Sequence, residues 1–209
     1  MEVKVLDING KDTGRTVQLS DSVFAIEPNK HAVYLDVKQY LANQRQGTHK
    51  AKERNEVAGS TRKIKKQKGT GTARAGSAKN PLFKGGGTVF GPRPRNYSFK
   101  LNKSLKRLAR KSAFTIKAQE QNLVVVEDFN FDTPNTKNFV NVLKALGLEN
   151  KKSLFVLGES NNNVYLSSRN LKRASVVMFS ELSTYKILNT NSLVLTEGSV
   201  EGIVENLTK

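Results

Sequence analysis

From Arg45 to Lys111 the chain reads RQGTHKAKERNEVAGSTRKIKKQKGTGTARAGSAKNPLFKGGGTVFGPRPRNYSFKLNKSLKRLARK. This segment holds 20 of the chain's 35 lysines and arginines but only two of its 18 acids, so the rest of the chain is close to neutral. It also holds nine of the 15 glycines, and up to Pro81 it has no aromatic residue. A segment of this kind cannot bury enough apolar surface to offset the entropy of ordering it. We therefore predict an extended basic loop that binds nucleic acid and is ordered by it.

The remaining residues, 1–44 and 96–209, are enough for one globular domain, with residues 45–95 as the inserted loop. After Asn122, short β-rich runs alternate with helical patterns, which predicts a mostly parallel sheet covered by helices on both faces, an α/β fold. The four runs predicted as strands are Leu123–Asp128, Ser153–Gly158, Ala174–Phe179 and Ser192–Gly198. The helices between and after them are expected near residues 136–147, 162–169, 183–188 and 199–207.

The N-terminal part of the chain has a different pattern. Alternating apolar residues in Glu2–Leu6 and Thr16–Leu19 predict a small β-hairpin, followed by a turn at Asp21 and Ser22. Pro28 and Asn29 open a helix that runs to about Asn43. The side chains expected on its buried face are Val33, Val37, Tyr40 and Leu41.

A second long helix is predicted to begin after Asn102 and to end near Gln119. Its expected buried face consists of Leu105, Leu108, Ala109, Ala113 and Ile116. Its other face carries five bases, Lys103, Lys106, Arg107, Arg110 and Lys111, and no acid. Such a face is either a solvated helix surface or an RNA contact, and the single sign of its charge favours RNA contact.

Composition argues against several classes of protein. There is no cysteine, and His31 and His49 lie in unrelated contexts, so neither a disulfide nor a metal site is expected. No apolar run approaches the ~20 residues needed to span a bilayer. The N-terminus MEVKVLDING lacks the pattern of a signal or transit peptide, which favours a cytosolic protein without a membrane partner. We expect no cofactor.

An enzyme remains the competing hypothesis, either nucleotide-dependent or RNA-modifying with a basic RNA-binding insertion. Gly71 and Gly76 have the spacing of a phosphate-binding loop, but Ser77 stands where that motif requires lysine, and no strand precedes it. Acids follow the predicted strands at Glu127-Asp128, Glu159 and Glu197. They could coordinate Mg²⁺, act as bases or cap the following helices; capping is favoured because no histidine, cysteine or serine elbow accompanies them. We therefore predict no catalytic residue.

The basic residues of the loop and of the following helix are the candidate RNA-binding set, because lysine and arginine contact phosphates without reading sequence. Its members are Arg45, Lys50, Lys52, Arg54, Arg62, Lys63, Lys65, Lys66, Lys68, Arg74, Lys79, Lys84, Arg93, Arg95, Lys100, Lys103, Lys106, Arg107 and Arg110. The aromatic residues Phe83, Tyr97 and Phe99 either stack on unpaired bases or pack the loop onto the domain. For Phe90 we expect packing.

Several motifs of the loop resemble bacterial large-subunit ribosomal protein four, and the resemblance covers essentially the whole chain. The motifs are Arg45–Thr48 (RQGT), Gly59-Ser60, Gln67–Gly71 (QKGTG), Ala73-Arg74, Gly76-Ser77, Gly85–Gly87 and Phe90–Pro94 (FGPRP). The resemblance implies a cytoplasmic structural protein, present in one copy in the large ribosomal subunit, that binds 23S rRNA, supports early assembly and forms no homo-oligomer. It further implies that the loop tip reaches the peptide exit tunnel and forms the constriction there with a loop of another ribosomal protein.

Carried over to this sequence, the tip is Thr61–Arg74. The residues that would line the tunnel are Arg62, Lys63, Ile64, Lys65, Lys66, Gln67, Lys68, Gly69, Thr70 and Gly71. The family usually has Pro-Trp where this chain has Ile64-Lys65, and an arginine where it has Thr72. The tip therefore lacks an aromatic stacking residue and a rigid proline.

Overall fold

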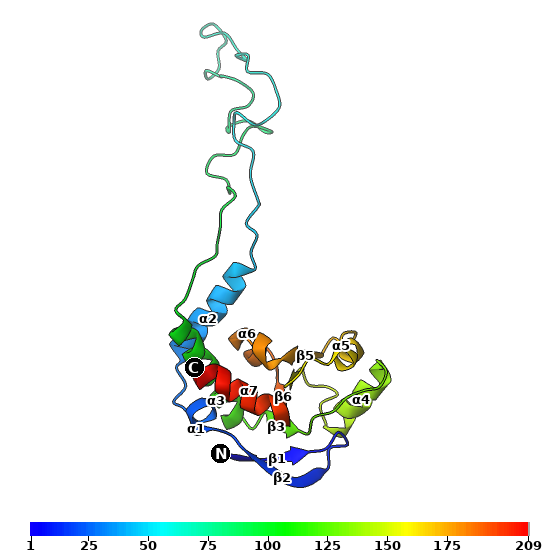
Figure 1. Ribbon diagram of the computed structural model, residues 1–209. Coiled ribbons are helices and arrows are strands. Elements are labelled where there is room, and N and C mark those ends of the chain that lie inside the picture. The colour runs from blue at the N-terminus through cyan, green and yellow to red at the C-terminus, as the bar shows by residue number, and fades with distance from the viewer. Residues whose placement is uncertain (209) are drawn as a thin grey trace. The chain divides into compact units, whose positions relative to one another are not determined.

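The computed structural model describes residues 1–208. The chain divides into two compact units (Figure 1). One contains residues 1–41 and the residues from Lys100 onward, and we call it the body. The other, Ala42–Phe99, we call the arm.

A six-stranded sheet forms the centre of the body, in the order β2-β1-β3-β6-β4-β5 (Figure 1). β3, β6, β4 and β5 are parallel, as predicted, and β1 also pairs in parallel with β3, while β2 is antiparallel to β1. The N-terminal hairpin is thus part of the main sheet. The strands are β1 (Glu2–Leu6), β2 (Asp12–Gln18), β3 (Leu123–Val126), β4 (Ser153–Leu157), β5 (Ala174–Met178) and β6 (Ser192–Thr196).

Helices cover both faces of this sheet, which confirms the predicted α/β class. They are α1 (Asp21–Phe24), α2 (Lys30–Asn43), α3 (Lys103–Gln119), α4 (Thr136–Ala145), α5 (Asn162–Ser168), α6 (Thr184–Leu188) and α7 (Glu197–Thr208), with a 3-10 turn η1 (Phe179–Glu181). α4 begins at Asn135, whose side chain accepts a hydrogen bond from the Lys137 amide at 2.9 Å, and Gly147 follows it with a φ of +68°. Both positions satisfy backbone groups that a helix end leaves unpaired.

The central strands are buried on both faces, and alternate side chains enter two separate cores. In β4, Leu154 and Val156 pack into a core with α1, α3 and α7, whereas Phe155 and Leu157 point into a core with α4 and α5. A strand buried on both sides needs an uninterrupted apolar run, and for that reason β4 and β6 could be recognised in the sequence.

Two predictions about the N-terminal helices were wrong in detail. The expected turn at Asp21 is the short helix α1, because Val23 and Phe24 are fully buried. In α2 the buried residues are Ala32, Asp36 and Gln39, while Leu41 is 44% exposed and Val33, Val37 and Tyr40 are half-buried. The reason is a polar and aromatic contact with α6: the Thr184 hydroxyl lies 2.5 Å from the Asp36 carboxylate, and Tyr40 stacks on Tyr185 with ring centroids 4.9 Å apart.

The buried face of α3 is also rotated from the predicted one. Ala109 and Ala113 are buried, but Leu105 and Ile116 are half-buried and Leu108 is 37% exposed. Phe114 is buried instead, with its ring centroid 5.3 Å from that of Phe24 in α1. The buried face of α3 therefore includes a contact with the short helix α1, which was absent from the prediction.

Candidate nucleic-acid interface

The arm consists of two limbs that lie side by side, one leaving and one returning (Figure 1). A few backbone hydrogen bonds join them: the Arg95 amide to the Gly47 carbonyl (3.1 Å), the Ala51 amide to the Pro92 carbonyl (3.0 Å) and the Thr88 amide to the Lys52 carbonyl (2.9 Å). Within residues 42–99 only Ser77 and Gly87 are buried. The arm therefore has limb-to-limb contacts but no apolar core.

The two limbs approach each other closely at Gly87. A Cβ atom added there would lie 2.3 Å from the backbone nitrogen of Arg54 and 2.5 Å from its Cα atom, closer than real Cβ atoms come to backbone. Gly87 does not have a positive φ, so its backbone conformation does not require glycine. The close approach of the opposite limb is what leaves no room for a side chain at this position.

We expect Gly87→Ala to separate the limbs and to weaken the RNA binding predicted from the sequence by tenfold or more, because a backbone atom cannot move aside as a flexible side chain can. The matched control is Gly76→Ala, since Gly76 also lacks a positive φ and an added Cβ would meet nothing within 4 Å. Filter binding measures both affinities. Equal affinities for the two variants would show that the close approach at Gly87 is not needed for binding.

Where the arm joins the body in sequence, the Tyr97 ring contacts two guanidinium groups. The Cζ atom of Arg45 is 3.6 Å and that of Arg95 is 4.5 Å from the centroid of its ring. The Tyr97 hydroxyl is 3.3 Å from Nε2 of His49. Interaction with the Arg95 guanidinium, and to a smaller extent with that of Arg45, lowers the pKa of Tyr97. Stacking leaves the N–H edges of a guanidinium available, so both arginines can still bind phosphate.

Each of the two acids of the arm forms an ion pair with a basic residue of the candidate RNA-binding set. Glu53 forms an ion pair with Arg93 on the opposite limb, and Glu56 forms one with Lys50. The hydrogen bond from Lys50 lowers the pKa of Glu56. Lys50 and Arg93 therefore help to hold the arm together. The sequence alone could not show this role, because it gives the charge of a residue but not its ion-pair partner.

The tip differs from the rest of the arm in having no acid. Each residue of Thr61–Arg74 is exposed, and this segment carries the bases Arg62, Lys63, Lys65, Lys66, Lys68 and Arg74. Two of them contact polar neighbours: Lys65 donates to the Thr72 hydroxyl at 2.8 Å, and Lys63 donates to the Gln67 side chain. Thr72 thus holds a basic side chain of the same tip in place.

Most other members of the candidate set are also accessible. The exposed ones are Arg45, Lys50, Lys52, Arg54, Lys84, Arg93, Arg95, Lys100 and Lys103, whereas Lys79, Lys106, Arg107 and Arg110 are half-buried. On α3, Lys111 is half-buried too, and Nε of Arg110 is buried without a hydrogen-bond partner. The basic face of α3 is therefore less open to a ligand than the tip.

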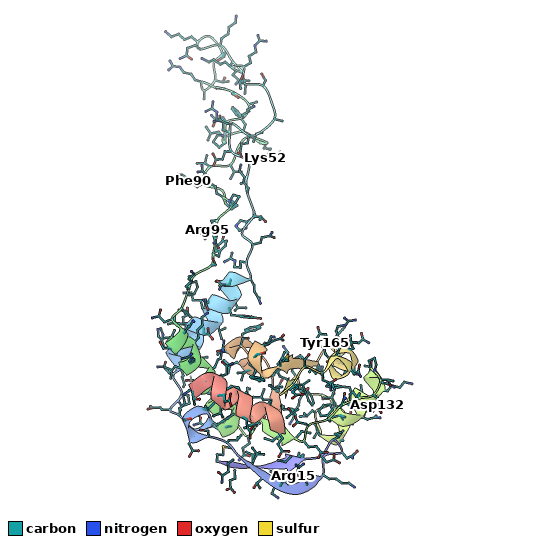
Figure 2. All side chains as sticks on the ribbon, in the orientation of Figure 1. Arg15, Lys52, Phe90, Arg95, Asp132 and Tyr165 are labelled. Carbon is teal, nitrogen blue, oxygen red and sulfur yellow. The ribbon has the colours of Figure 1, made fainter. Side chains whose placement is uncertain are left out.

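For Phe90 the packing prediction was wrong: its side chain is fully exposed, at 103% of the reference area, on the returning limb (Figure 2). Phe83 is 39% exposed, and Tyr97 and Phe99 are half-buried. The backbone φ of Phe90 is +55°.

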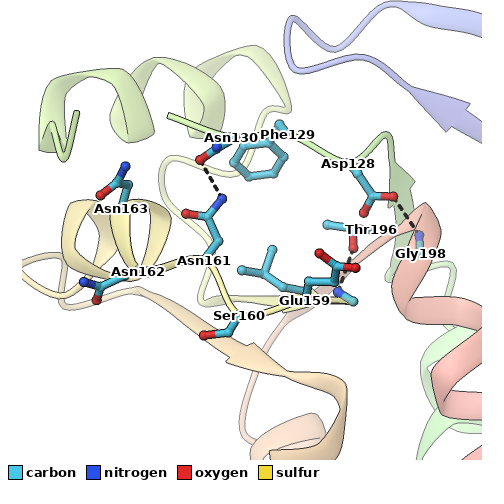
Figure 3. Close-up of a pocket in the computed structure, with 12 residues that line it drawn as sticks. Asp128, Phe129, Asn130, Glu159, Ser160, Asn161, Asn162, Asn163, Thr196 and Gly198 are labelled. Carbon is cyan, nitrogen blue, oxygen red and sulfur yellow. Dashed lines mark hydrogen bonds between the residues drawn. The ribbon is translucent and has the colours of Figure 1, made fainter. Parts of the chain in front are cut away.

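The ends of the parallel strands form a polar pocket of about 760 Å³ in the body (Figure 3). The Asp128 carboxylate there accepts a hydrogen bond from the Gly198 amide at 3.0 Å, in the first turn of α7, so it caps that helix. Glu127 and Glu197 both pair with Arg15, at 3.2 and 3.1 Å. A hydrogen bond with Asp7 raises the pKa of Glu127. Asp128 therefore caps a helix, but this helix is α7 and not α4, the one that follows it in the chain. Glu127 and Glu197 form ion pairs instead of caps, and Glu159 is an exposed residue of the pocket.

We expect Asp128→Ala to lower the free energy of unfolding by about 1 kcal/mol, the usual cost of losing a helix cap. Asp132→Ala is the control, because Asp132 is an exposed acid in the same connection between β3 and α4 (Figure 2). Urea unfolding followed by circular dichroism measures the difference. Equal midpoints and slopes for the two variants would show that Asp128 does not stabilise α7.

Within residues 1–208 no group of three or more histidine, cysteine or acidic side chains is placed to hold a metal ion. In the same residues, no helix is long and apolar enough to cross a membrane.

Comparison with known proteins identifies the family. The sequence pattern of the ribosomal protein L4/L1 family matches residues 17–206. The chain is 86% and 84% identical to the large ribosomal subunit proteins uL4 of Flavobacterium johnsoniae and Flavobacterium psychrophilum, over the full length of each pair. It is 60% identical to the uL4 protein of Parabacteroides distasonis, over 99% of both chains. The chain therefore belongs to the ribosomal protein L4/L1 family, a family of structural ribosomal proteins and not of enzymes.

Proposed function

We propose that this protein binds 23S rRNA through its arm and the N-terminal part of α3, supports assembly of the large subunit, and places the tip of the arm in the wall of the peptide exit tunnel. Family membership makes the protein a structural constituent of the large ribosomal subunit in the bacterial cytoplasm. The finer roles are our proposal. They include single-copy binding next to neighbouring ribosomal proteins, among them the one that shares the tunnel constriction.

The observation that carries the proposal is the tip. Fourteen consecutive residues, Thr61–Arg74, are exposed, six of them are basic and none is acidic. Like charges held close together repel one another, and only a polyanion offsets this repulsion while also ordering the backbone. In the body, three of the acids that follow strands have structural contacts, since Asp128 caps a helix and Glu127 and Glu197 pair with Arg15.

Sedimentation tests the proposal directly. The protein should travel with the 50S particle in a one-to-one ratio and remain there through a high-salt wash, because buried phosphate contacts are screened less than exposed ones. Loss of the protein in the wash while the particle stays intact would contradict a structural role in rRNA.

Amide exchange provides a prediction about order. In the free protein, the amides of Gly47–Gly76 should exchange orders of magnitude faster than those of β4 and β6, because few of them take part in limb-to-limb hydrogen bonds and there is no core beneath them. Binding to 23S rRNA should slow their exchange. Mass spectrometry of peptides from both states measures the change, and slow exchange throughout this segment without RNA would contradict the prediction.

A further inference from the structure

Phe90 is held in an unusual conformation for an aromatic residue. Its φ is +55°, and within residues 1–208 the only other non-glycine residue with a positive φ is Gln121. A bulky side chain rarely adopts this region, because its Cβ atom crowds the backbone. The side chain gains no packing in return, since it is fully exposed and its neighbour Val89 is 57% exposed.

The surrounding backbone fixes this conformation. On one side of Phe90 the Thr88 amide donates to the Lys52 carbonyl at 2.9 Å, and on the other the Pro92 carbonyl accepts from the Ala51 amide at 3.0 Å. Gly91, the next residue, packs closely against Ala51 of the outgoing limb, because a Cβ atom added to Gly91 would lie 2.5 Å from the Cβ of Ala51. The outgoing limb thus clamps the chain before and after Phe90 and presents its ring outward. Strain of this kind, held by its surroundings, is common where a ligand is clamped.

A hollow of about 770 Å³ lies beside Phe90, entirely within the arm. The basic side chains around it are Arg54, Arg93 and Arg95, and its aromatic ones besides Phe90 are His49 and Tyr97. Its one acid, Glu53, is already paired with Arg93. The volume is in the range of sites that hold small ligands. An aromatic face next to guanidinium groups that outnumber the acids is the chemistry that recognises a single nucleotide, its base by stacking and its phosphate by charge.

We propose that Phe90 and this hollow bind one unpaired nucleotide of the rRNA, with the base stacked on the Phe90 ring and the adjacent phosphates at Arg54 and Arg95. The site rests on the proposed binding of 23S rRNA and adds a specific subsite to it. RNA is favoured over a neighbouring protein because the three arginines and the single, already paired acid leave the hollow positively charged.

Substitution at Phe90 tests the stacking contact. Phe90→Ala should weaken binding to 23S rRNA about 5- to 150-fold, the effect of losing one stacked base, while the salt dependence stays unchanged because no phosphate contact is removed. Phe90→Gly relieves the positive φ and also removes the ring, so it should weaken binding equally if the ring is what matters. Phe90→Trp should bind like the original protein. Leu82→Ala is the control, because Leu82 is an 87% exposed apolar residue of the same limb that does not line the hollow.

Photocrosslinking identifies the occupant. With p-benzoylphenylalanine in place of Phe90, irradiated 50S particles should yield a crosslink to a single region of 23S rRNA. A crosslink to a ribosomal protein instead, or full affinity of both Phe90→Ala and Phe90→Gly, overturns the nucleotide site while the proposed rRNA function stands. If the unaltered protein fails to bind 23S rRNA at all, the proposed function fails and the subsite fails with it.

Discussion

The affinity of this protein for 23S rRNA should fall about 10³- to 10⁵-fold between 50 and 200 mM salt. This range follows if six to ten of its lysines and arginines each neutralise a phosphate and release the counterions condensed there, with somewhat smaller losses for single-stranded contacts. The tip alone supplies six exposed bases. Filter binding over a series of salt concentrations gives the slope of log K against log salt.

Three substitutions locate the source of this slope. Arg62→Gln, Lys66→Gln and Lys68→Gln together should reduce the slope by about 2 to 3 and weaken binding at 100 mM salt by about 10²-fold, because each removes one phosphate contact. The matched control replaces three exposed lysines of the body, at positions 11, 137 and 151, with glutamine and lowers the net charge equally. If both triple variants lose the same affinity, the effect comes from net charge, and the tip is not a contact surface.

The parallel part of the sheet could be predicted because its strands are buried on both faces, which forces a continuous apolar run such as Leu154–Leu157. The position of the hairpin could not. An alternating strand shows which of its faces is buried but not which strand it pairs with, so the parallel pairing of β1 with β3 left no local signal. The buried side of α2 was also unpredictable, because Asp36 is buried through a hydrogen bond to Thr184, 148 residues away.

In the candidate interface, too, features that depend on adjacent residues could be predicted, and contacts between residues far apart in the sequence could not. Charge identified the arm, since a run of bases without acids is a property of adjacent residues. The pairing of Glu53 with Arg93 joins two limbs 40 residues apart and cannot be read from either segment. Phe90 was misplaced for a related reason: its outward direction depends on the opposite limb, which holds the backbone on each side of it.

Deleting the tip should separate assembly from the shaping of the tunnel. The variant lacks Thr61–Arg74 and joins the two limbs with two glycines. The connection is feasible, because the Ser77 hydroxyl already donates to the Ser60 carbonyl at 3.0 Å. All fourteen removed residues are exposed, so the free energy of unfolding of the body should be unchanged within about 0.5 kcal/mol. The variant should enter large subunits, because the bases nearer the body, such as Lys52, Arg54 and Arg95, remain.

The tunnel, in contrast, should be wider, so stalling on an arrest peptide should weaken by several-fold. Two measurements decide the outcome: occupancy of the variant in purified 50S particles, and the fraction of ribosomes stalled on the arrest sequence. A full-length variant with the six tip bases changed to glutamine keeps the size of the tip but removes its charge. Comparing its stalling with that of the deletion variant shows whether size or charge of the tip matters. If the deletion variant never enters the particle, the tip is required for assembly and the two roles are not separable. If it enters and stalling stays at the original level, the tip does not line the tunnel, because a wall element shortened by fourteen residues must change the space available to the nascent chain.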